Sequence, residues 1–387
     1  MFRNIPFDRV NWVTSAFLII TALLTITAVP IYLYVCGWDW FLFGLFLVTY
    51  ALTGLSITVG YHRLFSHKAF KAKWPVRFFT VIFGAAAFEN SVLEWASDHR
   101  RHHKHVDTDD DPYDISKGFF WAHLGWLLFK ITPPPPFDNV NDLKKDPLVM
   151  WQHRWVHLIA FAVSFGLPTL LGYLYANLTG ALTPLEGALG GFLIGGVARV
   201  TCVQHSTFFI NSLCHMIGKQ SYSSKCSARD HWIMAIFTFG EGYHNYHHEF
   251  QWDYRNGVKP WQIDPSKWLI WTMSKIGLTS HLRRVSSEKI LLAEAREAQA
   301  KYAERMKSFE ADEFSGELLW DKAIQNMKEF EQRIMEIYNQ LLEAVQEKLA
   351  LSRSTLRSLR PELRKALAHL DYLTALRGNI ARQTAVG

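Results

Sequence analysis

Long runs of apolar residues alternate with polar stretches over the first two thirds of this 387-residue chain. A helix that crosses a bilayer needs about 20 apolar residues. Four runs reach this length, at residues 10–35, 38–60, 155–178 and 184–208. The first two are apolar around their whole circumference, which is not typical of a helix half exposed to water. The pattern predicts an all-α integral membrane protein whose four transmembrane helices form two hairpins.

A fifth apolar segment, residues 76–88, is shorter and is followed by the polar residues Glu89, Asn90 and Glu94. It is too short to span a bilayer as a helix. We expect it to form a helix that lies at the membrane interface or packs beneath the polar part of the molecule.

The last quarter of the chain is rich in Ala, Glu, Lys, Arg and Leu. Its apolar residues lie three and four positions apart, as at Leu341, Leu342, Val345 and Leu349. This spacing predicts amphipathic helices.

We therefore divide the chain into a transmembrane domain, residues 1–278, and a soluble helical C-terminal extension, residues 279–387. Gly316 and Pro361 are helix-breaking residues within the extension. They are expected to separate it into two or three helices.

Basic residues indicate how the chain is oriented in the membrane. They concentrate in the loop between the second and third apolar runs, whereas segments 36–39 and 177–183 contain no Lys or Arg. Cytoplasmic loops are enriched in Lys and Arg. Both termini and the long polar loop are therefore expected on the cytoplasmic side. The net charge of +6 does not narrow the function further.

Three histidine clusters interrupt the polar stretches. They are His62 and His67, then His99, His102 and His103, then His244, His247 and His248. Imidazole is a good neutral ligand for first-row metals, and one ion that keeps a position open for substrate does not take eight of them. The clusters predict a metal centre with two ions, held by a helical cap on the cytoplasmic side. Their spacing alone leaves iron, zinc and copper open.

The spacing within each cluster predicts how its rings are presented. In the second and third clusters the i, i+3, i+4 pattern places all three rings on one helical face. His62 and His67 are five residues apart, which turns their rings by about 140° on an α-helix. We expect these two residues to serve different ions. The ligand set leaves out His105, His123, His153, His157, His205 and His231.

The three clusters, in the contexts His-Arg-Leu-Phe-Ser-His, Asp-His-Arg-Arg-His-His-Lys and Gly-Glu-Gly-Tyr-His-Asn-Tyr-His-His-Glu-Phe, carry a family resemblance. The chain resembles the membrane-bound acyl-CoA desaturases of the stearoyl-CoA type, which insert a cis double bond at the delta-9 position. The resemblance covers residues 10–275. It identifies residues 1–278 as a fatty acid desaturase domain.

The resemblance implies a centre of two iron ions. The eight clustered histidines would be ligands, His215 would be a ninth, and Asn211, four residues before it, would hold a metal-bound water. A fatty acyl-CoA and dioxygen would be the substrates. The extension has no histidine pair or glycine motif of a fused cytochrome, so a separate electron-transfer protein, a ferredoxin, cytochrome or reductase, would supply two electrons. No nucleic acid is expected as a partner.

The resemblance also implies substrate contacts. Asn90 and Trp95 would contact the acyl thioester region and the upper tunnel. Phe46 and Tyr50, one helical turn apart, would limit the acyl length, although they could equally be ordinary packing aromatics. Lys130 would belong to a basic mouth for the CoA phosphates.

The same mouth would include Lys71, Lys73 and Arg77. Family members often have a basic residue directly before the Asp of the second cluster, but this chain has Ser97 there.

Carboxylates near the clusters are candidates for orienting the ligand rings. They are Asp98, Asp107, Asp109 and Glu241, whereas we expect Asp110 and Asp111 to lie in a solvated loop. Three alternatives stay open: a desaturase acting on lipid-bound or carrier-bound acyl chains, a membrane di-iron hydroxylase, and a histidine-rich metal transporter or sensor. The last would place its ligands inside the spans, where these clusters do not lie.

Overall fold

The computed structural model describes residues 7–130, 136–310, 318–347 and 351–384. The chain forms two compact units. The first comprises Met1–Lys219 and Cys226–Arg284, and the second comprises Gln220–Lys225 and Val285–Gly387. A short internal segment thus belongs to the same unit as the C-terminal helices.

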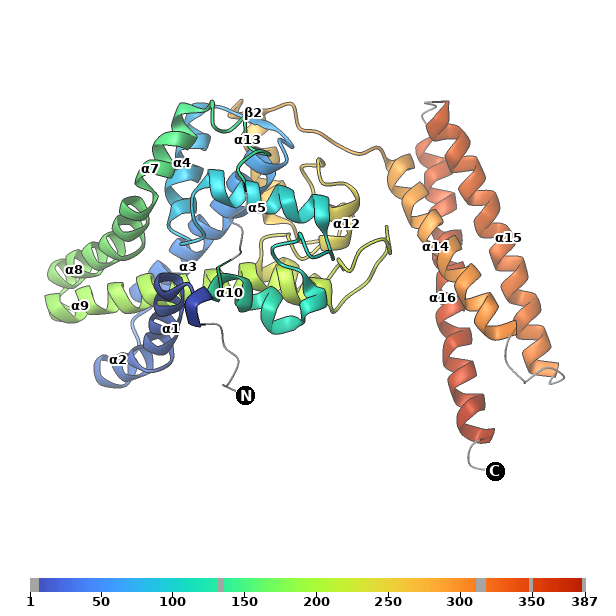
Figure 1. Ribbon diagram of the computed structural model, residues 1–387, viewed down its shortest axis with the longest axis horizontal. Helices are drawn as coiled ribbons and strands as arrows, with labels where there is room; N and C mark the ends of the chain where they lie inside the picture. Colours follow the sequence, from blue (N-terminus) through green and yellow to red (C-terminus); the bar gives the residue numbers. More distant parts are fainter. Residues whose placement is uncertain (1–6, 131–135, 311–317, 348–350, 385–387) are drawn as a thin grey trace. The chain divides into compact units, whose positions relative to one another are not determined.

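Four helices of the described chain are long and apolar enough to cross a membrane, which confirms the predicted spans. They run over Trp12–Cys36, Trp40–Ser66, Pro147–Thr179 and Pro184–His215. Each is a stack of shorter elements (Figure 1). These elements are α1 (Trp12–Ile26) and α2 (Ala28–Cys36); α3 (Trp40–Leu55) and a π-helix (Ser56–Ser66); α7 (Pro147–Phe161), a π-helix (Ala162–Gly166) and α8 (Leu167–Thr179); and α9 (Pro184–Gly190), a π-helix (Gly191–Ala198), α10 (Arg199–Ser212) and a 3₁₀ turn (Leu213–His215).

The third helix begins at Pro147, eight residues before the apolar run that predicts it. Val149 and Gln152 in its first two turns are buried inside the protein. Gln152 is fully buried, and its side chain accepts a hydrogen bond from the Val92 N–H and donates one to the Tyr61 hydroxyl. Hydropathy marks the part of a helix that lies in the bilayer, not the part that continues beyond it.

The rest of the first unit consists of short elements that cover the histidine clusters. These are α4 (Trp74–Ala85), α5 (Val92–His105), α6 (Trp126–Leu128), α11 (Trp232–Phe237), α12 (His244–Glu249), α13 (Pro265–Lys275), and the antiparallel pair β1 (Lys71–Ala72) and β2 (Thr279–Ser280), with single turns at Phe7–Arg9, Ile115–Lys117 and Trp121–Gly125. Helix α4 has only 12 residues, in line with the prediction that the fifth apolar segment does not span.

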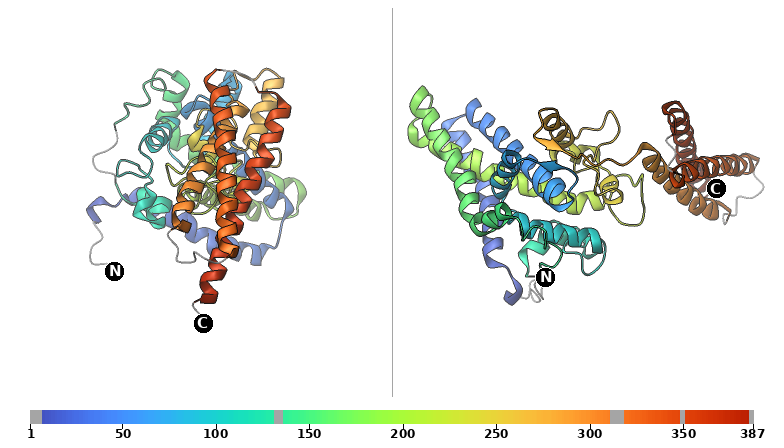
Figure 2. Two further views of the ribbon diagram at one scale, coloured as in Figure 1. Left: turned by 90° about the vertical axis from the view of Figure 1, so that its right-hand side faces the viewer. Right: turned by 90° about the horizontal axis from the view of Figure 1, so that it is seen from above.

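The second unit contains three long helices, α14 (Ser287–Glu310), α15 (Leu318–Gln346) and α16 (Arg353–Thr384), which lie side by side (Figure 2). Their apolar faces form a common core that includes Leu291, Tyr302, Met327, Ile334, Leu341 and Leu363. Pro361 does not divide this region as predicted, because it is accommodated inside α16. Gly316 lies outside the described residues.

Candidate metal centre

Nine histidines converge in two groups inside the first unit. The five-histidine group is His62, His67, His99, His103 and His247, and the four-histidine group is His102, His215, His244 and His248. Within each group the candidate ligand nitrogens all lie within 4.8 Å of one another. Among the described residues, each of the nine predicted histidine ligands belongs to one of these groups.

The spacing of the ring nitrogens fits a coordination sphere. The Nε2 atoms are 2.7 Å apart in His67 and His99, 2.9 Å in His62 and His247, and 3.1 Å in His215 and His244. Two imidazole nitrogens at right angles around a first-row ion, each about 2.1 Å from it, are about 3.0 Å apart. The residues present therefore fit a metal ion in each group.

Helix geometry explains how each cluster is shared between the groups. In α5, His99 and His103 are four residues apart and join the five-histidine group, whereas His102 joins the other. In α12, His244 and His248 are the pair four residues apart, and they join the four-histidine group, with His247 in the first. Positions i and i+4 are neighbours on one face, and position i+3 points slightly aside. The three histidines of α5 and the three histidines of α12 are thus each divided between the two groups.

The expectation that His62 and His67 serve different ions is wrong, because both lie in the five-histidine group. The segment Ser56–Ser66 is a π-helix, and the His67 N–H donates to the His62 carbonyl at 3.1 Å. In a π-helix, residues i and i+5 are about one turn apart and lie on the same face. In an α-helix, they would be about 140° apart around the axis. The two ring centroids are 4.8 Å apart.

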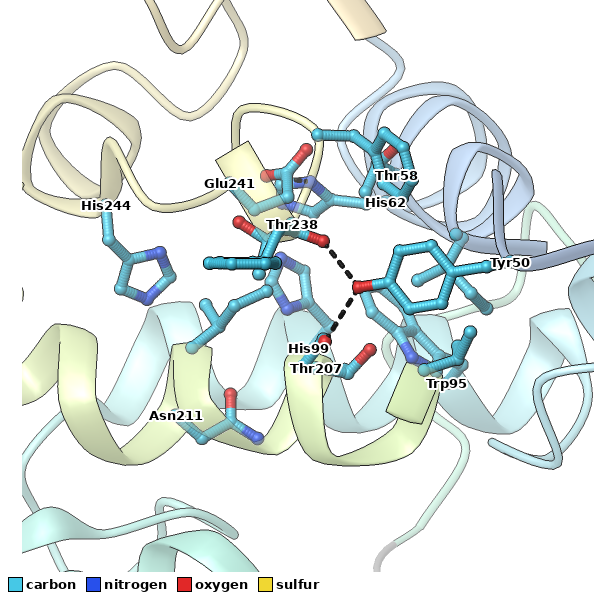
Figure 3. Close-up of a pocket in the computed structure, with 17 residues that line it drawn as sticks. Tyr50, Thr58, His62, Trp95, His99, Thr207, Asn211, Thr238, Glu241 and His244 are labelled. Atoms are coloured by element: carbon cyan, nitrogen blue, oxygen red, sulfur yellow. Dashed lines mark hydrogen bonds and ion pairs between the residues drawn. The ribbon is translucent and has the colours of Figure 1, made fainter. Parts of the chain in front are cut away.

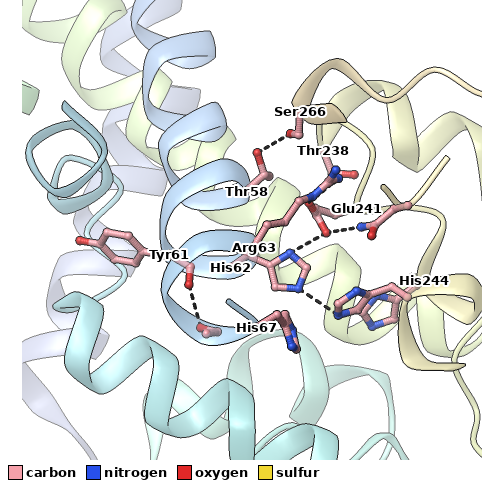
Figure 4. Close-up of polar contacts among 12 residues, drawn as sticks. Thr58, Tyr61, His62, Arg63, His67, Thr238, Glu241, His244 and Ser266 are labelled. Atoms are coloured by element: carbon pink, nitrogen blue, oxygen red, sulfur yellow. Dashed lines mark hydrogen bonds and ion pairs between the residues drawn. The ribbon is translucent and has the colours of Figure 1, made fainter. Parts of the chain in front are cut away.

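Glu241 orients the first ligand, as predicted for a carboxylate near the clusters. Its Oε2 is 2.8 Å from Nδ1 of His62, and its Oε1 is 2.9 Å from a guanidinium nitrogen of Arg63 (Figure 4). Burial alone would raise the pKa of Glu241, but the adjacent Arg63 and His62 bring this pKa below its ordinary value. An ionised Glu241 this close to Nδ1 of His62 favours the proton on Nδ1, which leaves Nε2 free to bind a metal.

The four-histidine group has carboxylates behind it as well. Asp111 is buried, and both of its carboxylate oxygens lie 2.9 Å from Nδ1 of His102. The expectation of a solvated Asp111 is therefore wrong, whereas its neighbour Asp110 is 80% exposed. The loop after α5 turns back at Asp107, which has a positive φ of 61°, and this turn points Asp111 inward.

A serine that the sequence pattern did not single out orients His215. The Oγ of Ser227 is 2.7 Å from Nδ1 of His215. The Ser227 hydroxyl and N–H both donate to the carboxylate of Asp107. Ser227 is twelve residues from His215 in sequence, so only the folded loop brings the two together.

Burial keeps the ligand rings neutral. Removal from water, followed by repulsion from neighbouring rings, lowers the pKa of His99, His103 and His247 well below 6.5. A neutral imidazole has the lone pair that a metal requires. The site is thus prepared for metal binding at neutral pH.

Two cavities reach the histidines. The inner cavity is lined by the ligands His62, His99 and His244 (Figure 3). Its largely apolar remainder includes Tyr50, Gly54, Ile57, Val203, Ile210, Phe237 and Phe239. The outer cavity has a volume of about 630 Å³. Four residues line both: Trp95, His99, Thr207 and Asn211. The two cavities therefore adjoin beside His99.

The predicted substrate residues are distributed over these cavities. Tyr50 lines the inner cavity, and its hydroxyl is 2.8 Å from Ser206 Oγ and from the Phe237 carbonyl. Phe46 stacks on Tyr50 with ring centroids 6.1 Å apart and is not among the lining residues. Asn90 and Lys130 line the outer cavity, and Trp95 lines both. Arg77 forms an ion pair with Asp146 and is not among the lining residues of either cavity.

Asn211 borders both cavities, on α10 one turn before His215. In the sequence, Glu89 stands out only as a charge that ends an apolar segment. It lines the outer cavity and accepts a hydrogen bond from the Trp95 indole at 3.1 Å. The Trp95 ring in turn stacks on His99, with centroids 4.8 Å apart. Burial raises the pKa of Glu89 to about 7.

Comparison with known proteins yields consistent matches. Residues 37–264 match the family model described as fatty acid desaturase. The chain is 40% identical over 287 residues to acyl-CoA desaturase 1 of Saccharomyces cerevisiae, covering 73% of this chain and 54% of that protein. It is 44% identical over 246 residues to a probable acyl-CoA desaturase of Schizosaccharomyces pombe, covering 63% and 49%.

A third relative, the stearoyl-CoA desaturase of Homo sapiens, is 33% identical over 296 residues, covering 76% of this chain and 79% of that protein. The chain thus spans about half the length of the two yeast relatives and most of the human one.

Proposed function

Because this chain belongs to the fatty acid desaturase family, we propose that it desaturates a saturated fatty acyl-CoA and inserts a cis double bond at the delta-9 position. One observation carries the proposal. Two groups of buried imidazoles border a narrow, largely apolar inner cavity that adjoins a larger outer one. The arrangement suits a long acyl chain that passes beside a metal pair.

The two histidine groups would hold two iron ions, one in each group. Imidazole suits iron, zinc and copper alike, so the choice of iron rests on the reaction. A saturated methylene has no proton that a side-chain base can remove at neutral pH. Two reduced irons would supply the activation of dioxygen that such C–H bonds require.

The reaction balances with an external reductant. The acyl chain loses two hydrogens, dioxygen takes up these two hydrogens together with two protons and two electrons, and two water molecules and one C=C double bond result. The electrons come from a separate electron-transfer protein, a ferredoxin, cytochrome or reductase.

The residues of the chain position the substrate. The acyl end enters the inner cavity, and Tyr50, held by Ser206 and Phe237, closes it and limits the acyl length. Where the two cavities adjoin, Trp95 and Thr207 place two neighbouring methylenes of the acyl chain beside His99. The outer cavity receives the thioester end near Asn90, and Lys130 faces the CoA phosphates. Asn211 would hold a water at the metal pair.

The metal centre and both termini lie on the cytoplasmic side. The basic loop between the second and third spans supports this orientation, since the short segments 36–39 and 177–183 carry no Lys or Arg. CoA esters and soluble electron donors would then reach the outer cavity directly.

The test is lipid analysis of cells that express the wild-type chain, His102→Ala or His105→Ala. His105 lies on the same helix as His102 but outside both metal groups, so its variant is the matched control. We expect new delta-9 monounsaturated acyl chains with wild type and His105→Ala, and none with His102→Ala. Double-bond position is read by mass spectrometry after derivatisation.

Two other outcomes would redirect the assignment. Hydroxylated chains would identify a hydroxylase of the same metal type. Desaturation of purified membrane lipid, but not of acyl-CoA, by the reconstituted enzyme would identify an acyl-lipid desaturase. Absence of product from a chain that contains two irons and receives electrons would contradict the proposal.

A further inference from the structure

The loop after the ligand His215 is a hairpin whose two parts belong to different units. Its stem pairs Lys219 with Asp230 through N–H to carbonyl hydrogen bonds of 3.0 and 2.8 Å, within the first unit. Its tip, Gln220–Lys225, belongs to the second unit with the C-terminal helices. The chain is continuous, so any displacement of the tip acts on the stem.

The stem orients ligands of the four-histidine group. Ser227 contacts Nδ1 of His215, and the Arg229 N–H donates to the Cys214 carbonyl at 2.7 Å. Asp230 accepts a hydrogen bond from the Tyr246 N–H at 3.1 Å, inside the helix that carries His244 and His248. Three of the four ligands in this group therefore depend on the stem.

Two charged residues of α14 hold the tip. The Ser224 N–H donates to Oε2 of Glu297 at 2.9 Å, and the Lys301 ammonium donates to the Gln220 carbonyl. Glu297 and Lys301 also pair with each other at 3.2 Å, one helical turn apart. Glu297 is only 5% exposed. Hydrogen bonds from the backbone to ionised groups are stronger than neutral ones, and burial limits competition from water.

We propose that Glu297 and Lys301 are positioning residues for the metal centre, through which the C-terminal helical unit holds the hairpin and thereby the four-histidine group. The inference rests on the proposed function, since it requires an iron ion in that group. It assigns the extension a role in metal retention. Loss of the contacts between α14 and the tip weakens the binding of the ion in the four-histidine group and leaves the five-histidine group intact.

The experiment uses the full-length chain loaded with iron and measures iron per chain over time after a chelator is added. The test variant is Glu297→Ala with Lys301→Met. The rescue variant, Glu297→Gln with Lys301→Arg, keeps the acceptor and the donor. The control, Glu304→Ala with Lys307→Met, changes exposed residues of the same helix.

We expect two irons per chain in the wild type. In the test variant, one iron should leave about tenfold faster and the other at the wild-type rate, as for loss of a residue that orients a ligand. The rescue and control variants should stay near wild type.

Unchanged loss of both irons, or equally accelerated loss of both, would overturn the inference alone. A wild-type chain that binds no iron would overturn the proposed function together with it. Metal retention is read independently of desaturation, so the two failures are distinguishable.

Discussion

The Nδ1 atom of a ligand histidine determines which ring nitrogen is free for a metal. In this chain Glu241, Asp111 and Ser227 contact Nδ1 of three ligands at 2.7 to 2.9 Å. Such partners fix the ring orientation and increase the basicity of the ligand. Glu241 and Asp111 are buried, so solvent does not replace them when they are lost, whereas Ser227 is half-buried.

We expect Asp111→Asn to weaken metal binding in the four-histidine group by about 10- to 100-fold, because His102 loses its anionic acceptor. Asp110→Asn is the matched control, since Asp110 is adjacent in sequence and 80% exposed. Iron per chain after dialysis against a graded series of chelator concentrations measures the effect. Equal iron retention by the two variants would show that Asp111 has no orienting role.

Glu89 introduces a pH dependence of stability. Burial raises its pKa to about 7 in the folded protein, whereas the unfolded chain has the ordinary value near 4.5. The contribution of Glu89 to stability is therefore fully present below about pH 4.5 and is lost as the pH rises through 7, by at most about 3 kcal/mol.

We expect Glu89→Gln to remove this dependence, because glutamine keeps an acceptor for Trp95 and does not ionise. In detergent, the unfolding temperature of the wild type should fall relative to that of Glu89→Gln between pH 5 and 8. Parallel curves over this range would mean that Glu89 keeps one charge state throughout.

At the level of the elements, the π-helix Ser56–Ser66 is the part of the fold that most directly shapes the centre. It packs closely on α4 through Gly60: a Cβ at this position would lie 2.5 Å from Thr80 Cβ. Residues with a side chain therefore cannot replace Gly60 without moving α4 or the π-helix.

We expect Gly60→Ala to lower the free energy of unfolding by about 1 to 3 kcal/mol, the usual cost of overpacking. Gly44→Ala in α3 is the control, because its Cβ would meet no atom within 4 Å. The control should be neutral or slightly stabilising, since alanine favours helix more than glycine does. Thermal unfolding in detergent checks both, and a Gly60→Ala chain as stable as the control would contradict the packing argument.

Sequence patterns predicted which elements form better than they predicted the local geometry of those elements. The four spans follow from hydropathy, which is a property of each segment by itself. The grouping of His62 with His67 does not follow from the sequence, because the angle of about 140° holds for α-helical turns and the chain forms π-helical turns here. Asp111 and Ser227 were missed for another reason: their positions relative to His102 and His215 depend on loops.

At the scale of the whole molecule, we expect the four candidate spans to place the metal centre and the short turn between α8 and α9 on opposite sides of the bilayer. In sealed vesicles with the cytoplasmic face outward, we expect Lys145→Cys to react at once with a membrane-impermeant maleimide. Ala181→Cys should react only after permeabilisation. The reverse order would place the metal centre on the other side of the membrane.

The π-helix Ser56–Ser66 also limits which codon changes the gene can tolerate. An i to i+5 hydrogen bond encloses one residue more than the i to i+4 bond of an α-helix. Deleting a single codon between those of His62 and His67 would leave room only for an i to i+4 bond between the two ligands, and it would remove one of the buried residues Arg63, Leu64, Phe65 and Ser66. Loss of one codon there would change which buried side chain occupies each position between the two ligands, so insertions and deletions are tolerated less in this stretch than conservative substitutions.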